Sequence, residues 1–296
     1  MSEIVPSEKI VPVEPSAVLT GRRWWLPLVQ NRLNLLAVVL LGVLLLVAVL
    51  AGVIAPYSPN AAAGFPIQTP SWDHWFGTDE IGRDVFSRLL HGSRISLYVG
   101  FGATTIAAVI GVPLGIVSGY FGKFLDTVLM RVVDGMLAFP PIILAMAAVA
   151  VLGPNLRNTI IAIGVVQIPR FARQVRAMTS SLREREFVLA ARVLGGGHIY
   201  IMAKAVLPNL VPIILVQFTL TFATAVLTEA ALSFLGLGAQ PPSPSWGAML
   251  NTGKVLLSTN PWLAIGAGVS IFFTVLVFTL LGDALSDVVN PFRLDR

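Results

Sequence analysis

The chain has 296 residues, of which 55% are hydrophobic and only 12% are charged, whereas roughly 25% of residues are charged in soluble domains. This composition excludes an ordinary soluble domain and predicts an all-α integral membrane protein, and the absence of cysteine excludes disulfides, thiolate metal sites and a cysteine nucleophile. The formal charge is +5, but the basic residues lie between apolar runs, which favours a role in membrane topology over nucleic-acid binding.

The N-terminal part of the chain predicts a tail, one span and an external segment. Residues 1–32 contain scattered charge and the prolines Pro6, Pro12 and Pro15, which is typical of a disordered cytoplasmic tail. Within the next region, 33–93, residues 35–55 carry no charge and are long enough to cross a bilayer as a helix that Pro56 ends. The polar stretch 57–94 is expected to be an external segment ending in a short amphipathic helix.

Residues 94–289 predict the main membrane domain. Its first span, the second of the chain, covers 95–121 and is rich in glycine, which allows close helix contact: Gly100, Gly102, Gly111, Gly115 and Gly119. A third helix over 126–152 is expected to kink at Pro140 and Pro141. A fourth begins near residue 158 and is apolar only to residue 168. Three arginines at a three-residue spacing follow, which predicts that this helix projects into the cytoplasm.

A fifth helix is predicted over 209–235, with Glu229 as its only charge. The Pro-rich stretch 240–246 cannot continue that helix. Residues up to 259 therefore predict an external or re-entrant hairpin. A sixth helix follows over 261–285, and 290–296 is expected to be a short cytoplasmic tail.

The lysines and arginines predict the orientation of these spans. Of the 20 basic residues, all but five fall on one side of the predicted membrane. The five exceptions are Arg83, Arg88, Arg94, Arg157 and Lys254. Because the side richer in lysine and arginine is normally cytoplasmic, six spans with both termini in the cytoplasm are expected.

Residues 182–208, between the fourth and fifth spans, form the one long stretch that looks soluble. Its first half predicts a short helix with apolar residues at i, i+3, i+4 and i+7: Phe187, Ala190, Ala191 and Leu194. The glycine run 195–197 breaks this helix, and a second helical stretch is expected over 198–208. Since the loop belongs to the cytoplasmic side, an apolar stripe there requires a partner groove.

The same stretch resembles a known motif. Ala190, Ala191, Gly195, Leu207 and Pro208 stand at the spacing of the EAA loop of ABC importer permeases. The wider string, which includes Arg185, Glu186, Phe187 and Leu194, is most similar to the dipeptide, oligopeptide and nickel branch of that family. In this family the loop docks the membrane subunit onto a separate ATPase, so the resemblance implies that these residues form an ATPase-coupling loop. Leu189 occupies the position of the glutamate that names the motif, and Glu186 is the nearest acid.

Further strings resemble the same branch in the same order, at 75–85, at 231–247 and at Gly282-Asp283. The resemblance implies a type I ABC importer permease fold in a bacterial inner membrane, with di- or oligopeptides, nickel or another small solute as substrate. It also implies three kinds of partner: a homologous second permease, two ATP-binding subunits and an external substrate-binding protein. ATP and magnesium are then expected in the ATPase subunits, with no cofactor in this chain.

No catalytic or metal site is predicted. The nearest likeness to a P-loop is 248–254, but Val255 stands where a Ser or Thr would hold magnesium. His74, His91 and His198 have no Cys or carboxylate at ligand spacing, so a structural or solvated role is expected for each. The chain is therefore predicted not to be an enzyme.

Three acids within predicted helices are candidates for the translocation path, because an acid at the bilayer centre costs roughly 2.5–3.5 kcal/mol on insertion scales. They are Asp134, Glu229 and Asp283. Each also has a structural alternative. Asp134 follows Arg131 by one turn and can pair with it, Glu229 can form a helix–helix contact, and Asp283 can cap a helix end or lie in an interface.

Two functions of other classes stay open from the sequence. One is a secondary transporter driven by an ion gradient through Asp134 or Glu229, but the halves show no convincing repeat and the cytoplasmic loop is left unexplained. The other is a membrane scaffold, which fits the composition and predicts no association with an ATPase.

Overall fold

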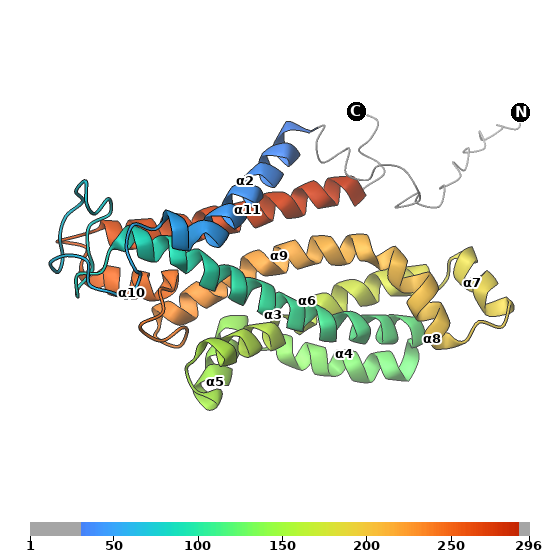
Figure 1. Ribbon diagram of the computed structural model, residues 1–296. Helices are drawn as coiled ribbons and strands as arrows, with labels where there is room; N and C mark the ends of the chain where they lie inside the picture. The colour runs from blue at the N-terminus through green and yellow to red at the C-terminus, as the bar shows by residue number, and fades with distance from the viewer. Residues whose placement is uncertain (1–30, 290–296) are drawn as a thin grey trace, which may run out of the picture.

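The computed structural model describes residues 31–289, and every regular element in this range is a helix. The elements are α2 (Arg32–Ile54), α3 (Val85–Phe121), α4 (Lys123–Leu137), α5 (Pro141–Leu152), α6 (Leu156–Leu182), α7 (Glu186–Val193), α8 (His198–Tyr200), the π-helix η1 (Ile201–Val206), α9 (Leu207–Phe234), α10 (Trp246–Val255) and α11 (Trp262–Val289). In Figure 1 they form an elongated bundle, with the loop before α3 and helix α10 at one end and α7 and α8 at the other. The predicted tails, 1–32 and 290–296, lie outside the described residues except for Asn31 and Arg32.

Within 31–289, four helical segments are long and apolar enough to cross a membrane: α2, α3, the continuous stretch from α8 to α9, and α11. Helices α4 and α5 pass the same test only as one span bent by 87° at the break between them. The predicted proline kink is therefore confirmed as a sharp break. Helix α6 is 27 residues long but contains four arginines. The number six for the spans stays a prediction.

Helices α3 and α6 pack closely along most of their length because glycines on α3 face the backbone of α6. A Cβ added to Gly115 would lie 2.6 Å from the Ala172 carbonyl oxygen, and one added to Gly119 would lie 2.6 Å from the Arg176 carbonyl oxygen. The predicted use of these glycines in helix packing is confirmed. The two helices run in the same direction, so α4 and α5 must carry the chain back along the bundle.

Helix α3 begins at Val85, ten residues before the predicted start of the second span. The prediction stopped at Arg94 because charge normally marks the end of a span. In the structure, Arg94 donates from Nε to the Ala48 carbonyl oxygen (2.6 Å) and from Nη2 to that of Val49 (2.7 Å). Arg88 similarly donates to the Pro59 carbonyl oxygen (2.9 Å). Because backbone carbonyls of the preceding segment accept hydrogen bonds from Arg88 and Arg94, these charges do not end the helix. The predicted amphipathic helix therefore continues directly into the span.

The predicted boundary between the loop and the fifth span is wrong. Residues 198–234 form one helix of 37 residues, with a π-helical stretch at Ile201–Val206. Such a widened turn accommodates Pro208, which has no N–H to donate. The Asn209 side chain donates to the Ala205 carbonyl oxygen (2.7 Å) and so satisfies one acceptor near the proline.

The buried core lies among α3, α5, α6 and α9, and its centre includes the fully buried Val99, Ile163 and Ala225. Helix α2, by contrast, keeps many large aliphatic side chains exposed, such as Val49 at 71%. That pattern is typical of a helix that faces lipid on one side.

Candidate functional site

Helix α7 projects at one end of the bundle, between the last turn of α6 and the start of α8 (Figure 1). Arg183, which caps α6, donates from Nη1 to the Gly119 carbonyl oxygen at the end of α3 (3.2 Å). The chain then turns at Arg185 and enters α7 at Glu186. The loop therefore leaves the bundle from a point that α3 and α6 hold jointly.

Two of the three glycines after α7 are required by the backbone. Gly195 has φ = +83°, a conformation that side chains with a Cβ disfavour, and its N–H donates to the Arg192 carbonyl oxygen (3.0 Å). A Cβ on Gly196 would lie 2.7 Å from the Ala191 carbonyl oxygen. Gly197 has φ = −68° and open space around it. The predicted turn is confirmed, and Gly195 and Gly196 are the glycines whose backbone conformation or close contact it needs.

Helix α7 is anchored by Val188, which is fully buried in a cluster with Phe171, Val175 and Ile201. Ala191 packs partly buried against the same cluster. The predicted stripe is therefore wrong as a single face, because only its member Ala191 turns toward the bundle. Val188 lies one position after Phe187 and is the buried residue that the helical spacing missed.

The outer face of the loop is apolar and exposed. Its large side chains and their exposed fractions are Phe187 (41%), Leu189 (44%), Val193 (87%), Leu194 (88%), Ile199 (80%) and Tyr200 (61%). Ala190 is exposed beside them, and so are Arg185 and Glu186 at the start of α7. We call this set the outer loop face. A surface of this kind, on a loop with a rigid mount, is typical of a protein–protein contact.

The loop is also fastened to the end of α3 by aromatic and polar contacts of Arg192 and His198. The Tyr120 hydroxyl lies 3.1 Å from His198 Nδ1, and the His198 ring packs edge-on against Phe121. The Arg192 guanidinium lies over the Tyr120 ring at 5.7 Å. His198 thus has the structural role that was expected. Tyr120 was missed because no local pattern links residues 78 positions apart.

Beside α7 lies a groove of about 400 Å³ that is rich in positive charge. Lys123, Arg183 and Arg192 line it, together with Glu184 and Leu189. Leu207 and Pro208, the last predicted members of the loop, lie in the first turn of α9, where Leu207 packs against the cluster around Val188. The loop residues predicted for coupling are thus assembled at one end of the bundle, although Ala191 and Leu207 serve to mount the loop.

The three candidate path acids have different surroundings. Asp134 pairs with Arg173 Nη2 at 2.6 Å, not with Arg131 as expected, because Arg173 approaches from the adjacent α6. Glu229 is fully buried, and its Oε1 accepts from the Ser233 hydroxyl (2.6 Å) and the Ser245 hydroxyl (3.1 Å). The helix–helix contact predicted for Glu229 is therefore confirmed, since Ser245 begins α10.

Asp283 is exposed, and α11 continues past it to Val289, so the predicted end-cap is wrong. The two acids considered for ion coupling, Asp134 and Glu229, both have protein partners.

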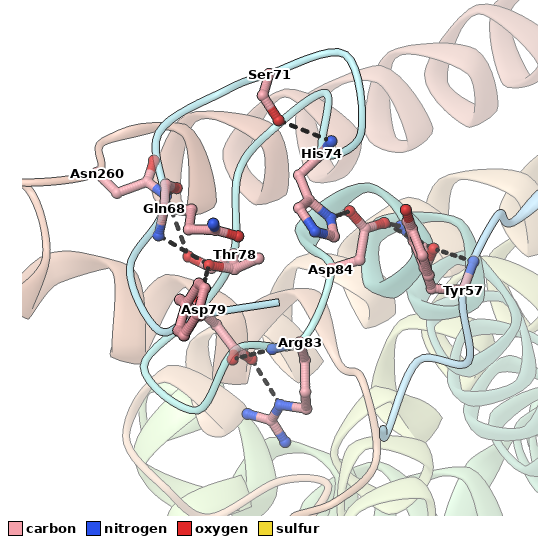
Figure 2. Close-up of polar contacts among 11 residues, drawn as sticks. Tyr57, Gln68, Ser71, His74, Thr78, Asp79, Arg83, Asp84 and Asn260 are labelled. Atoms are coloured by element: carbon pink, nitrogen blue, oxygen red, sulfur yellow. Dashed lines mark hydrogen bonds and ion pairs between the residues drawn. The ribbon is translucent and has the colours of Figure 1, made fainter. Parts of the chain in front are cut away.

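At the opposite end of the bundle, the segment before α3 is held by a buried polar network that the sequence analysis did not identify (Figure 2). Asp84, the N-cap of α3, accepts from Ser87 and lies 2.9 Å from His74 Nδ1. Asp79 accepts from Arg83 Nε at 2.6 Å. The Asn260 side chain reaches across from the start of α11 and donates to the carbonyl oxygens of residues 68 and 78. These contacts order the segment. Among the described residues no group of acids, histidines or cysteines could hold a metal ion.

Two family models of known membrane transport proteins match this chain. Residues 111–294 match the family model described as binding-protein-dependent transport system inner membrane component. Residues 20–71 match the N-terminal TM domain of oligopeptide transport permease C.

Two curated relatives cover almost the whole chain. The dipeptide transport system permease protein DppC of Alkalihalophilus pseudofirmus is 43% identical over 279 residues, 93% of this chain and 91% of its own length. The glutathione transport system permease protein GsiD of Escherichia coli O157:H7 is 42% identical over 282 residues, 94% of this chain and 93% of its own length.

Among solved structures, an inward-facing conformation of the MetNI methionine ABC transporter matches with a TM-score of 0.57 at 22% identity. The match covers 69% of this chain and 96% of the other. At this identity the likeness concerns the fold alone.

Proposed function

The chain belongs to the family of binding-protein-dependent transport system inner membrane components, and from this membership we propose how its loop and its spans act in transport. It is a multi-pass permease subunit of a peptide ABC importer, and ATP hydrolysis belongs to separate subunits. The single observation that carries the coupling proposal is the outer loop face, an exposed apolar surface mounted on the ends of three bundle helices.

The outer loop face is the docking surface for an ATP-binding subunit. Leu194 and Val193 have the largest exposed fractions of this face, and burying such side chains stabilises a contact by about 1.5–3 kcal/mol each. The neighbouring groove with Lys123, Arg183 and Arg192 adds positive charge that complements an acidic rim on the partner. Leu189, in place of the family's glutamate, extends the apolar contact, and Glu186 supplies a carboxylate one turn earlier.

The contacts that hold α7 on the bundle allow movement of the ATPase subunits to move the spans. Val188 and Tyr120 tie α7 to α3 and α6, and the chain passes from His198 into α9 without a break. When ATP draws two ATPase subunits together, a pull on α7 is transmitted to α6 and α9 as rigid bodies. The spans then change between inward-open and outward-open arrangements. ATP and magnesium are bound by the ATPase subunits.

The complete importer contains further subunits. One set of these helices does not enclose a path for a peptide-sized solute, so a homologous second permease completes it. Two ATP-binding subunits dock on the two permeases, and an external binding protein delivers the solute. The end of the bundle with α7 lies in the cytoplasm of a bacterial cell, and the His74–Asp84 end lies outside the inner membrane, as the distribution of basic residues favours.

The substrate class is di- or oligopeptides. The relatives named above carry a dipeptide and glutathione, which is itself a small peptide. Nickel or another small solute is the alternative within the same family. The binding protein sets the final choice.

A single substitution tests the docking role without disturbing the fold. Leu194 is 88% exposed, so Leu194→Asp removes an apolar contact and adds a charge at the docking surface only. Val255→Asp is the matched control, since Val255 is 74% exposed at the opposite end of the bundle. In membranes that contain all subunits, we expect Leu194→Asp to weaken ATPase association and ATP-driven dipeptide uptake at least tenfold, while Val255→Asp retains both.

Equal behaviour of the two variants would contradict the docking role. A second measurement separates the ion-coupled alternative: the chain alone in vesicles, given an ion gradient and no ATP, should not accumulate dipeptide. Accumulation under those conditions would favour the secondary transporter.

A further inference from the structure

An open groove of about 310 Å³ lies between α6, α9 and α11, well away from the outer loop face. Four of its eight lining residues are polar, which is unusual for the middle of membrane-spanning helices: Arg170, Gln217, Thr224 and Thr279. The rest is aliphatic. None of the acids predicted for the path lines it.

Two of the polar side chains that line the groove, Arg170 and Thr224, are hydrogen-bonded to each other. Arg170 Nη1 and Gln167 Nε2 both donate to the Thr224 hydroxyl, at 3.2 and 3.0 Å. Gln167 is buried behind this contact, and its Oε1 has no hydrogen-bond partner in the described structure. Gln217 donates to the Thr221 hydroxyl at 3.0 Å. The groove is therefore mostly aliphatic, with a few polar groups that are held in place by hydrogen bonds.

Among the three arginines in the second half of α6, Arg170 is the one without a carboxylate partner in residues 31–289. Arg173 pairs with Asp134 at 2.6 Å and Arg176 pairs with Asp126 at 2.5 Å. Arg170 has no carboxylate partner in residues 31–289, and its side chain is exposed in the groove. A guanidinium with its donors largely free is suited to a planar anion such as a carboxylate.

The position of the groove indicates what it faces. The sequence pattern predicts that α6 leaves the membrane just before Arg170. In the structure, Arg170 instead hydrogen-bonds to Thr224, which lies within the long apolar helix that ends at Phe234, so Arg170 lies at the level of the spans. A cation and amides at this depth are costly against lipid, and such residues normally face a water-filled cavity or the interior of a bundle. This face of the chain therefore borders water or polar protein.

We propose that the groove is part of the solute path and that Arg170 binds a carboxylate of the passing solute. The inference rests on the proposed transport function and adds a chemical class: solutes with a free carboxylate, as every unmodified peptide has. Gln217 and Thr279 provide donors and acceptors for the solute's amide groups. Because Arg170 is exposed, water screens the contact, so the solute is held weakly enough to move on.

Cysteine labelling tests the proposal directly, since the chain has no native cysteine. In the assembled importer, with cysteine-free partner subunits, Thr279→Cys is treated with an anionic sulfonate thiosulfonate reagent and with a cationic trimethylammonium one. Both reagents need water to react. We expect labelling, with the anionic reagent favoured at least fivefold relative to its preference for a free thiol in solution, because a unit positive charge lies in the same groove.

A second substitution identifies the source of that preference. Added to Thr279→Cys, Arg170→Gln should abolish the anion preference and Arg170→Lys should keep it. Arg173→Gln is the matched control one turn along α6, and it should leave the preference intact because the charge of Arg173 is already paired. In a cysteine-free background, Arg170→Gln should also lower ATP-driven uptake of dialanine about tenfold, with little change for Arg173→Gln.

Two results would overturn the inference. One is no labelling of Thr279→Cys in either the nucleotide-free or the vanadate-trapped importer, which would place the groove off the water path. The other is an anion preference that survives Arg170→Gln. If dialanine is imported while either result holds, the peptide-import function stands and only the role of the groove fails. If the anion preference holds but dialanine is not imported, the carboxylate site stands and the dipeptide assignment fails.

Discussion

Single buried residues in this protein fasten elements together. Glu229 illustrates the point, because its carboxylate accepts from Ser233 on its own helix and from Ser245 at the start of α10. Ser245 in turn caps α10 through a hydrogen bond from the Ala248 N–H. Glu229, one of the three candidate path acids, therefore joins α9 to the start of α10; we call this contact the latch.

The latch predicts a stability effect. Glu229→Ala leaves two buried hydroxyls without their acceptor and a space behind, which should lower the free energy of unfolding by about 1–3 kcal/mol. Glu229→Gln keeps the acceptor oxygen and most of the volume, so its effect should be smaller. Thermal unfolding of the purified protein in detergent measures both, with the exposed Glu80→Ala as a control near wild type. A wild-type unfolding temperature for Glu229→Ala would exclude the latch.

The glycine turn after α7 allows a matched comparison. Gly195→Ala forces a residue with a Cβ to φ = +83°, at a cost of roughly 1–2 kcal/mol, whereas Gly197→Ala keeps φ = −68° with open space around it. We expect faster hydrogen exchange of the α7 amides in Gly195→Ala and no change in Gly197→Ala. Equal exchange in the two variants would mean that the turn does not hold the loop.

At the scale of elements, the sequence predicted helix features set by local residues and missed those set by contacts with distant parts of the chain. Apolar runs and prolines predicted α2, the break between α4 and α5, and the end of α9. The start of α3 was misplaced because Arg94 is satisfied by carbonyls about 45 residues earlier. In the same way, helical spacing predicted that α7 exists, but its buried anchor Val188 depends on α3, α6 and η1.

The contact between α3 and α6 predicts a strong element-level effect. Gly115→Val places two methyl groups against the backbone of α6, which cannot move aside as a flexible side chain can. We expect a loss of roughly 3 kcal/mol in the free energy of unfolding and poor yield of folded protein. Gly135→Val is the control, because no atom lies within 4 Å of a Cβ at Gly135 on α4. The reverse order of stability would show that close α3–α6 packing is not needed.

For the whole molecule, the relative direction of the packed helices says more about the number of membrane crossings than their apolar composition does. Four helical segments in 31–289 pass a test of length and apolarity, yet α3 and α6 lie side by side in the same direction. The chain can join two parallel helices only by returning between them, and α4 with α5 is the segment available. The packing therefore supports the prediction of six crossings, two of which, the bent α4–α5 pair and the arginine-containing α6, are not long apolar helices by themselves.

Single cysteines test this topology, again because the chain has none of its own. Three exposed positions mark the segments in question: Trp72 (96%) before α3, Val151 (87%) at the end of α5, and Leu194 (88%) after α7. With a maleimide that cannot cross membranes, we expect Trp72→Cys and Val151→Cys to be labelled in intact cells, after any outer membrane has been made permeable. Leu194→Cys should be labelled only after lysis.

The Val151→Cys variant decides the number of crossings, because Trp72 and Leu194 give the same result whether or not α4 and α5 cross. If it reacts from outside, the bent pair carries the chain across the membrane, and α6 must cross back to reach α7. If it reacts only after lysis, α4 and α5 turn back on the side they started from, and the parallel arrangement of α3 and α6 cannot be maintained across a bilayer. Labelling of Leu194→Cys from outside would reverse the whole orientation and separate the loop from any cytoplasmic ATPase.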